Sequence, residues 1–134
     1  MPIIVRPNNF EAVVLGAKGP ILIDFFGENC MPCRILRPIL MELSQEYDGI
    51  TYGLFKTDRE PWETDKEFEE KFAVLAALGV MHLPTMLLFI NGVLVQTIVG
   101  LHTKEELLEI FTELGLALKP VKKNEPDPDG GKNS

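Results

Sequence analysis

Two cysteines lie close together in this sequence, and they are the residues best suited to carry chemistry. Cys30 and Cys33 are separated by Met31 and Pro32, and the 134 residues contain no further cysteine. Such a pair can be a structural disulfide, half of a metal site or a reversible redox couple. A structural bridge is the weakest interpretation, because closing so short a segment removes little conformational entropy from the unfolded chain. A lone close pair is also seldom a permanent bridge in a reducing compartment.

A metal site would need ligands that the two cysteines cannot provide alone. Zinc takes about four ligands in a structural site. His82 lies near Pro84 and could approach as a third ligand, whereas His102 is expected at the surface or at the entry of a helix. The sequence has no second pair of closely spaced cysteines, so we expect no metal here. A redox couple is the interpretation that remains.

The position of the pair in the predicted secondary structure favours redox chemistry. Residues 30–47 have apolar side chains at helical spacing, and a buried strand is predicted just before them. Cys30 therefore opens a helix, where unpaired N–H groups and the positive end of the helix dipole favour a thiolate. Cys33 follows one turn later on the same face, so a slight tightening of the turn closes a disulfide. Pro32 fixes the backbone there and has no N–H group. We expect Cys30 to attack disulfides and Cys33, which lies further in, to resolve the product.

An aspartate and a proline elsewhere in the chain extend this candidate site. Asp24 lies inside the apolar run Pro20–Phe26, where burial of a carboxylate is costly and should raise its pKa. It could be a core carboxyl bonded to the backbone, but its place on the strand that leads to Cys30 favours a proton acceptor for Cys33. Pro84 stands at the start of another predicted strand, a position that proline can also occupy without any function.

The hydrophobic pattern predicts an alternation of strands and helices around this site. Strands are predicted at 2–5, 20–26, 50–58, 84–90 and 93–99. Helices are predicted from Asn8 or Asn9 to about Gly16 or Gly19, at 30–47 with a kink at Pro38, at 64–79 with Phe68, Phe72 and Leu75 on one face, and from Thr103 with Leu107, Phe111, Leu114 and Leu118 in the core. Asn91-Gly92 suits a tight hairpin turn. The order βαβαβαββα predicts an α/β sandwich, parallel in its first part and with an antiparallel hairpin at one side.

Composition and charge limit the classes of partner. The chain has 46% apolar and 25% charged residues, as expected for one globular domain, and its formal net charge is −7. We expect neither nucleic acid nor membrane as a partner, because phosphate groups bind basic surfaces and no run approaches the roughly 18 apolar residues of a membrane span. The N-terminus lacks the pattern of a signal peptide, so we place the protein in the cytoplasm. Residues 1–118 form the predicted domain, and residues 119–134 are expected to be a disordered tail.

Together these residues resemble the thioredoxin family. The likeness covers about residues 3–118, and the matching positions are Asp24, Phe25, Gly27, Glu28, Cys30, Pro32, Cys33, Arg34, Pro38, the segment LPTMLLFING, Gly92 and Gly100. The resemblance implies a thioredoxin-like three-layer sandwich with a mixed central sheet flanked by helices. It also implies a cis peptide bond between Leu83 and Pro84. The residues that it implies in client binding are Met31, Pro32, Leu83, Pro84 and Gly100.

The resemblance also implies an activity. It indicates a thiol–disulfide oxidoreductase that reduces disulfides of client proteins through Cys30 and Cys33, with Asp24 helping to deprotonate Cys33. We expect a monomer that needs no cofactor beyond its cysteines and that a reductase recycles. Two alternatives remain open: a partner-dedicated thioredoxin-fold module without redox activity, and a more oxidising, isomerase-like protein.

The sequence departs from the family pattern at several positions near the site. Asn29 stands where thioredoxins usually carry Trp, and Met31 where they usually have Gly. Leu54 is expected in place of the lysine that is common near the buried aspartate, and this loss should raise the pKa of Asp24 further. The stretch between Asp58 and Pro84 is also longer than usual. Trp62, within that stretch, is either a packing residue or a substitute for the missing aromatic side chain beside the site.

Overall fold

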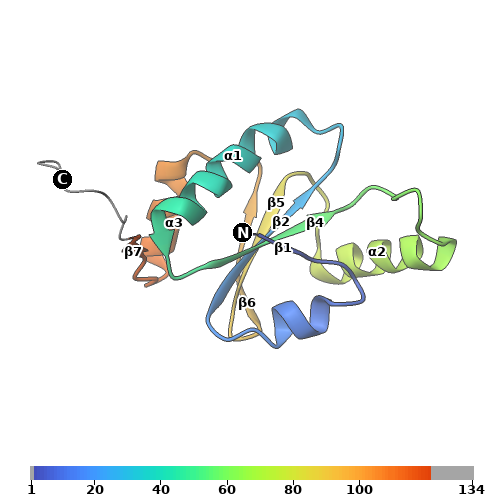
Figure 1. Cartoon of the computed structure of the whole chain (residues 1–134), viewed down its shortest axis with the longest axis horizontal. Coiled ribbons are helices and arrows are strands. Elements are labelled where there is room, and N and C mark those ends of the chain that lie inside the picture. Colours follow the sequence, from blue (N-terminus) through green and yellow to red (C-terminus); the bar gives the residue numbers. More distant parts are fainter. Residues whose placement is uncertain (1, 122–134) are drawn as a thin grey trace, which may run out of the picture.

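The elements of the computed structural model follow the predicted alternation of strands and helices, and the structure describes residues 2–121. In chain order they are β1 (Ile3–Ile4), the π-helical turn η1 (Glu11–Leu15), β2 (Pro20–Phe26), α1 (Met31–Glu46), β3 (Tyr47–Asp48), β4 (Thr51–Lys56), α2 (Asp65–Leu78), β5 (Thr85–Ile90), β6 (Val93–Val99), α3 (Lys104–Glu113) and β7 (Lys119–Pro120). The predicted α/β class is confirmed (Figure 1).

A mixed sheet of five strands, in the order β1-β4-β2-β5-β6, forms the centre of the fold. β4 runs parallel to β1 and β2, whereas β5 runs antiparallel to β2 and β6. β2 is the middle strand and is buried along almost its whole length, as its apolar run predicts. The register pairs Phe26 with Lys56, Phe25 with Thr85, and Thr85 with Val99. The ends of β2, β4 and β6 and the start of β5 therefore meet at one end of the sheet.

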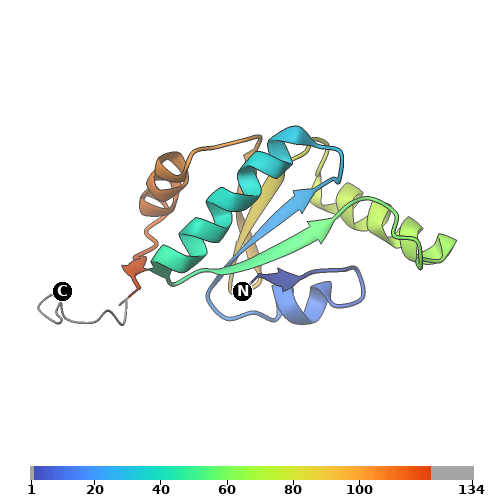
Figure 2. The ribbon, with the colours of Figure 1, turned by 45° about the horizontal axis from the view of Figure 1, so that its top comes forward.

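Helices cover both faces of the sheet and make the three layers that were predicted (Figures 1 and 2). On one face α1 and α3 pack over a core of Leu22, Leu36, Leu40, Leu43, Tyr52, Met86, Leu88, Ile98, Leu107 and Phe111. On the other face η1 and α2 pack over a core of Val5, Phe10, Val14, Ile21, Ile23, Phe25, Phe55, Leu87 and Phe89. Successive residues of β2 alternate between these two cores because neighbouring side chains of a strand point to opposite faces.

Two predicted helix starts are confirmed as capping boxes, whereas the first helix is the short turn η1, whose N-cap is Phe10 and not Asn8 or Asn9. Thr64 and Thr103 each accept a hydrogen bond from the N–H of the glutamate three residues later. These glutamates, Glu67 and Glu106, each accept a hydrogen bond in return from the backbone N–H of the threonine, at 2.9 Å in both helices. Both helices thus begin with a complete capping box. α1 begins and ends within one residue of its predicted range and contains Pro38.

The predicted hairpin joins β5 to β6 through a tight turn. Asn91 and Gly92 have φ values of 51° and 81°, in the left-handed region that these two residue types tolerate best. The side chain of Asn91 accepts a hydrogen bond from the Gly19 N–H at 2.7 Å. A β-carbon at Gly92 would collide with the carbonyl oxygen of Leu15. The turn therefore holds the hairpin against the segment that precedes β2.

Charge as well as apolar packing holds helix α2. Phe68, Phe72 and Leu75 were predicted on one face of the helix, and of these Phe72 is 58% exposed while the other two are half-buried. The buried residue of this helix is instead Lys71, which is 3% exposed. Its Nζ forms a salt bridge of 2.7 Å with Glu63, so the helix is fixed partly by charge. Phe68 and Phe72 pack against each other, with ring centroids 4.9 Å apart. A hydrophobic pattern alone cannot reveal such an ion pair.

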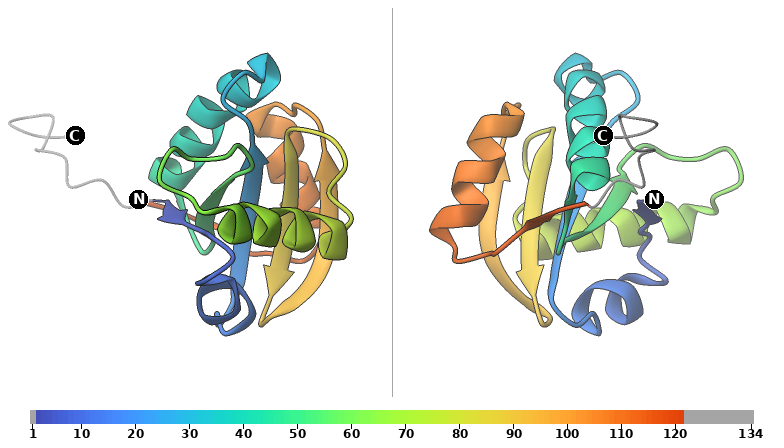
Figure 3. Two further views of the ribbon diagram at one scale, coloured as in Figure 1. Left: turned by 90° about the vertical axis from the view of Figure 1, so that its right-hand side faces the viewer. Right: turned by 60° about the vertical axis from the view of Figure 1, so that its left-hand side comes forward.

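Two short strands carry the fold slightly beyond the predicted boundary at residue 118. β3 and β7 pair in antiparallel fashion, and the Val121 N–H donates to the Glu46 carbonyl at 2.8 Å. Figure 3 shows β7 beside the last turn of α1. Lys119 and Pro120, which were predicted to belong to a disordered tail, are thus paired through the backbone. Backbone pairing of this kind leaves no apolar pattern in the sequence. Residues 122–134 of the predicted tail lie outside the described residues. No helix in the described part of the chain is long and apolar enough to cross a membrane.

Candidate active site

The two cysteines lie at the start of α1, as predicted. Cys30 is the N-cap residue, and its Sγ accepts a hydrogen bond from the Cys33 N–H at 3.3 Å. A disulfide joins Cys30 to Cys33, whose Cα atoms are 5.2 Å apart. Cys30 is half-buried, whereas Cys33 is only 3% exposed. The sulfur that a large molecule can approach is therefore that of Cys30, with Cys33 beneath it.

The electrostatic surroundings of the Cys30 sulfur favour a negative charge. It lies at the positive end of the α1 dipole, and the first turn of α1 contains no acidic residue that would offset this field. Pro32 occupies the second helical position and has no N–H group, and the N–H group that donates to the sulfur is that of Cys33. The same backbone can therefore stabilise a thiolate on Cys30 once the disulfide is reduced.

The loop that leads from β2 to Cys30 is held in place through Glu28. Its N–H donates to an Asp58 carboxylate oxygen at 2.6 Å, and its own carboxylate accepts from Lys56 at 2.7 Å. The guanidinium of Arg34 donates from Nε and Nη2 to the Glu28 carbonyl, at 3.3 and 3.1 Å. Three elements, β2, β4 and α1, thus fix the position of the N-cap residue. Sequence reasoning matched Glu28 and Arg34 to the family pattern but did not identify this network.

The loop before β5 lies against the same region. The peptide bond between Leu83 and Pro84 is cis, which confirms the prediction. A β-carbon on Gly27 would lie 3.1 Å from Cδ1 of Leu83, so the glycine allows this loop to approach the loop before Cys30. The Gly100 N–H donates to the Pro84 carbonyl at 2.8 Å. The segments of the chain that carry the predicted client-binding residues therefore converge.

The exposure of these predicted client-binding residues differs. Met31 is 63% exposed and Leu83 is 38% exposed, so both present apolar surface to solvent. Pro32 is exposed as well, Gly100 is half-buried, and Pro84 is buried. Side chains of Met31, Pro32 and Leu83 are accessible to a partner, whereas Pro84 can shape this surface only through its backbone and its neighbours.

Asp24 is fully buried, on the face of β2 that α1 covers. Its register partners are Leu54 on β4 and Met86 on β5, both apolar, so Leu54 does stand beside the aspartate as predicted. Neither carboxylate oxygen has a hydrogen-bond partner among the described residues. Burial raises the pKa of Asp24 from 3.8 to about 7, and the positive charge of Arg37 works in the opposite direction. The alternative that Asp24 is a core carboxyl hydrogen-bonded to the backbone is therefore contradicted.

A cavity of about 330 Å³ opens beside the inner cysteine. Its lining residues are Phe26, Gly27, Glu28, Cys33, Arg34, Arg37 and Pro38. The guanidinium carbon of Arg37 lies 4.3 Å from the centroid of the Phe26 ring, in the geometry of a cation–π contact. Sequence reasoning passed over Arg37, although its position one turn after Cys33 on a helix could have suggested it.

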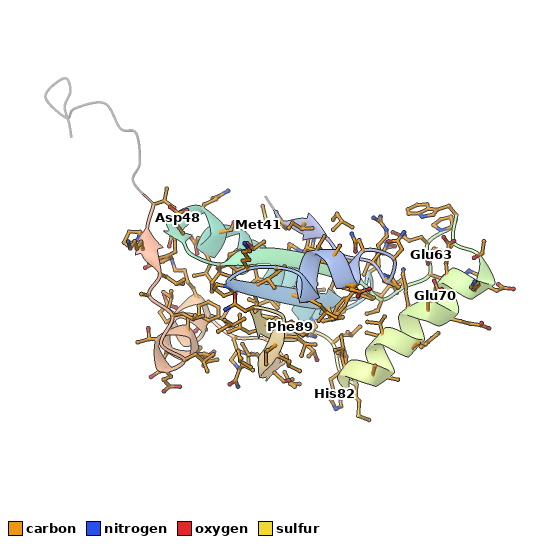
Figure 4. All side chains as sticks on the ribbon, turned by 90° about the horizontal axis from the view of Figure 1, so that it is seen from below. Met41, Asp48, Glu63, Glu70, His82 and Phe89 are labelled. Carbon is orange, nitrogen blue, oxygen red and sulfur yellow. A yellow bond between two sulfur atoms is a disulfide. The ribbon has the colours of Figure 1, made fainter. Side chains whose placement is uncertain are left out.

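The two histidines and Trp62, which were also considered from the sequence, lie on three separate loops. His82 is exposed, and Figure 4 shows it at the edge of the molecule, next to the end of α2. His102 lies with Nδ1 3.1 Å from the Gly100 carbonyl oxygen. Within residues 2–121, no three His, Cys, Asp or Glu side chains form a group that could hold a metal ion. Trp62 is 65% exposed and lines a separate hollow with Arg6, so it does not replace the missing aromatic side chain beside the cysteines.

Comparison with known proteins agrees with this geometry. The family model described as Thioredoxin matches residues 1–113. A thioredoxin of Rickettsia bellii (strain RML369-C) is 37% identical over 78% of this chain and 90% of its own length. A thioredoxin of Chlamydia pneumoniae is 36% identical over 82% of this chain and 95% of its own, and one of Buchnera aphidicola subsp. Acyrthosiphon pisum is 35% identical over 79% and 89%.

These matches, with the Cys30–Cys33 disulfide, establish what the protein does. It is a thiol–disulfide oxidoreductase with protein-disulfide reductase activity. Thioredoxins act on disulfides of protein substrates and are returned to the dithiol form by a reductase. The chain belongs to the thioredoxin family.

Proposed function

We propose that Cys30 is the attacking nucleophile of this reductase, Cys33 its resolving thiol and Asp24 its proton acceptor. The observation that carries the proposal is the position of Cys30 as the N-cap of α1, where its sulfur accepts the Cys33 N–H. The positive end of the helix dipole stabilises a negative charge on an N-cap sulfur, and the thiolate is the form that attacks disulfides. The deeper burial of Cys33 supports its later role, because a client reaches Cys30 first.

The reaction proceeds in two exchange steps. The Cys30 thiolate attacks one sulfur of the client disulfide, which forms a mixed disulfide and releases the other client sulfur as a thiolate. Cys33 then loses its proton to Asp24 and attacks the Cys30 sulfur. The Cys30–Cys33 bond forms, the bond from Cys30 to the client breaks, and the second client sulfur leaves. Two electrons pass to the client, which takes up two protons.

Asp24 suits the role of proton acceptor because its pKa is near neutral. A carboxyl with a pKa of about 7 is partly ionised at physiological pH and can both take and return a proton. A carboxyl at the ordinary value of 3.8 would be a much weaker base. The position of Asp24 on the face of β2 that α1 covers supports a proton path from Cys33.

The apolar surface around Cys30 is the proposed contact area for the client. Met31, Pro32 and Leu83 supply accessible side chains, and Pro84 and Gly100 supply the backbone that holds Leu83 in place. Burial of apolar surface contributes roughly 25 cal/mol per Å², so even a small patch can hold an extended client segment during the exchange.

The cellular setting belongs to the proposal as well. We place the protein in the cytoplasm, as a monomer whose dithiol form is restored by a reductase. The formal net charge of −7 supports the absence of nucleic acid and anionic membranes among its partners. Size-exclusion chromatography with light scattering at two concentrations tests the monomer, because a dimer would double the measured mass.

Reduction of insulin by dithiothreitol tests the activity and the roles of the two cysteines. The wild-type protein should accelerate the reaction, and Cys30→Ser should not. Cys33→Ser should instead accumulate a mixed disulfide with the client, visible on a non-reducing gel. Cys33→Ser protein that releases its client as fast as the wild type would contradict the resolving role. Equilibration with glutathione buffers would then separate a reductant from a more oxidising, isomerase-like protein by its potential.

A further inference from the structure

The buried Asp24 lacks the kind of partner that a buried carboxyl usually has. Both of its oxygens are without a hydrogen bond among the described residues, and the strand neighbours Leu54 and Met86 are apolar. Lys56 lies two residues after Leu54 on the same face of β4, but its Nζ is bound to Glu28 at 2.7 Å and to Glu60 at 2.9 Å. The lysine of β4 is therefore committed to the loop before Cys30.

The cation nearest to the cavity beside Cys33 that is not bound to Glu28 or Glu60 comes from helix α1 and is Arg37. Arg37 follows Cys33 by four residues on α1, so both side chains project from one helix face, and both line the same cavity. Its guanidinium rests on the ring of Phe26, which lies two residues after Asp24 on the same face of β2. The Nε atom of Arg37 is buried and has no hydrogen-bond partner among the described residues. A charged group with an unused donor thus lies beside the inner cysteine.

We propose that Arg37 is a positioning residue for the resolving step, in which its guanidinium favours the ionised form of Asp24 and provides a polar wall for the cavity beside Cys33. This inference rests on the proposed function, since it concerns how Asp24 receives the proton of Cys33. The effect fits the structure, because the charge of Arg37 opposes the rise that burial causes in the pKa of Asp24.

The other ionisable groups on this side of the sheet do not offer the same help. Cys33 on α1 is the proton donor itself. Tyr52 on β4 is buried, and burial raises its pKa to about 12, so it stays neutral. The positive charge of Lys56 is compensated by its ion pairs with Glu28 and Glu60. Arg34 lines the cavity but donates to the Glu28 carbonyl. Arg37 is left as the cation that acts on the carboxyl.

The size of the effect follows from the ionised fraction of Asp24. An opposite charge close to a carboxyl commonly shifts its pKa by about one unit or more. If the loss of Arg37 raised the pKa of Asp24 from about 7 to roughly 8, the ionised fraction at pH 7 would fall about fivefold. The rate at which Cys33 resolves a mixed disulfide should fall by the same factor at pH 7 and recover as the pH rises.

Two measurements on Arg37→Met test the proposal. The first is the titration of the Asp24 carboxyl carbon by NMR in the reduced protein, which does not depend on activity. The second is the pH profile of the reaction with an aryl disulfide that releases one coloured thiolate in each exchange step, where the second release reports on Cys33. We expect the Asp24 titration to move up by about one unit and the second release to slow about fivefold at pH 7.

Three further variants separate a direct effect from a general one. Arg37→Lys keeps the charge and should restore most of the titration and the rate. Arg34→Met removes another cation from the same cavity wall and should leave the titration of Asp24 in place. In an Asp24→Asn background, Arg37→Met should change the second release by less than about twofold, because the carboxyl on which it acts is gone.

An unchanged Asp24 titration in Arg37→Met, or an equal slowing in the Asp24→Asn background, would overturn the proposal. Failure of Arg37→Lys to restore the titration would overturn it as well. A wild-type protein that never releases the second thiolate would instead show that the proposed function is wrong. The titration would still decide whether Arg37 acts on Asp24, so the two failures are distinguishable.

Discussion

The starts of α1 and α2 show two ways of treating the same physical problem. Both helices follow strands that run parallel in the sheet, and both present unpaired N–H groups and a positive dipole end. α2 opens with a capping box between Thr64 and Glu67, and Asp65 adds a second carboxylate to its first turn. α1 opens with the sulfur of Cys30 and has no acidic residue in its first turn.

Buried charge follows the same division. Near α2, Glu63 pairs with Lys71 at 2.7 Å, and Lys71 also donates to the Asp58 carbonyl at 2.6 Å (Figure 4 labels Glu63). Burial alone would raise the pKa of Glu63, but the hydrogen bonds from Lys71 and from the Glu60 N–H, together with the positive charges of Lys71 and Arg6, outweigh it, and the pKa is lowered. Near α1, Asp24 has no hydrogen-bond partner among the described residues, and burial raises its pKa to about 7.

The difference shows where this fold keeps polar groups unsatisfied. At the start of α2 the N-terminal cap is complete and the buried charges of Glu63 and Lys71 are paired, as is usual for buried polar groups. Around α1 the N-cap sulfur, the Asp24 carboxyl and Arg37 Nε are arranged so that a charge can appear or disappear. Groups with strongly shifted pKa values tend to cluster at functional sites. The comparison thus separates a helix start that stabilises the fold from one that serves the reaction.

Among the changes that test this comparison, replacing Asp24, whose carboxyl has no hydrogen-bond partner among the described residues, should have the largest effect on stability. Asp24 has a pKa of about 7 in the folded protein against 3.8 in its ordinary state, so the unfolded chain releases its proton first as the pH rises. The free energy of unfolding should therefore fall as the pH rises from about 4 to 7. A shift of about three units corresponds to about 4 kcal/mol at pH 8. Urea unfolding of oxidised wild type and Asp24→Asn at pH 4 and pH 8 measures this difference.

The comparison between the two pH values isolates the ionisation of Asp24. Any cost of burying the asparagine amide is the same at pH 4 and pH 8 and cancels in the difference. Relative to Asp24→Asn, the wild type should lose stability between these pH values. Equal pH dependence in the two proteins would show that Asp24 is not the group whose pKa is raised.

Removing Lys71, the ion-pair partner of the buried Glu63 carboxyl, should lower the free energy of unfolding almost as much. Lys71→Met leaves Glu63 buried without its ion pair, and an unpaired buried charge typically destabilises a protein by about 3 kcal/mol or more. The midpoint of urea unfolding at pH 7 should fall accordingly. Lys66→Met is a matched control, because Lys66 is an exposed residue of the same helix. A stability loss no larger than that of the control would mean that the ion pair contributes little.

The cap of α2 should contribute to stability without contributing to the reaction. Thr64→Ala removes the hydroxyl that accepts the Glu67 N–H and should cost about 1 kcal/mol of unfolding free energy. Thr103→Ala makes the same change in α3 and should cost a similar amount. Thermal unfolding of the two variants measures both effects, and insulin reduction at a temperature where both are folded should match the wild type. A large loss of activity in Thr64→Ala alone would contradict the division between the two helix starts.

An acid placed in the first turn of α1 should make it resemble α2. Met31→Glu puts a carboxylate beside Cys30, where it competes with the thiolate for the positive end of the helix. An effect of roughly 0.3 to 1 kcal/mol would raise the pKa of the Cys30 thiol by up to about 0.7 units. Alkylation of the reduced protein across a pH series measures this pKa, and Met31→Gln controls for the loss of the methionine side chain. Identical titrations of the Glu and Gln variants would show that the dipole argument is wrong for this helix.

Much of the fold could be predicted because its signals are local. The capping boxes at Thr64 and Thr103 and the turn at Asn91-Gly92 each depend on a few neighbouring residues, and each was confirmed. The burial of β2 follows from its continuous apolar run. The burial of Lys71 in α2 was not predicted, because its partner Glu63 lies outside the helix. β7 was missed because backbone pairing leaves no mark in the pattern of apolar residues.

The candidate site divides in the same way. The spacing of Cys30 and Cys33 at a helix start, and the carboxyl of Asp24 within an apolar strand, are visible in the sequence because each belongs to one element. The anchoring of Glu28 by Asp58 and the approach of Arg37 to the region of Asp24 join residues from different elements. Such contacts depend on strand register and on how a helix lies across the sheet, and neither is encoded in any single short segment.

The sequence by itself therefore determined the reacting atoms and the elements that present them. Which charges surround those atoms was decided only in the tertiary structure. The physical reason is range: helix dipoles, caps and turns act within a few residues of the chain, whereas desolvation and charge–charge interaction depend on the neighbours that packing brings together.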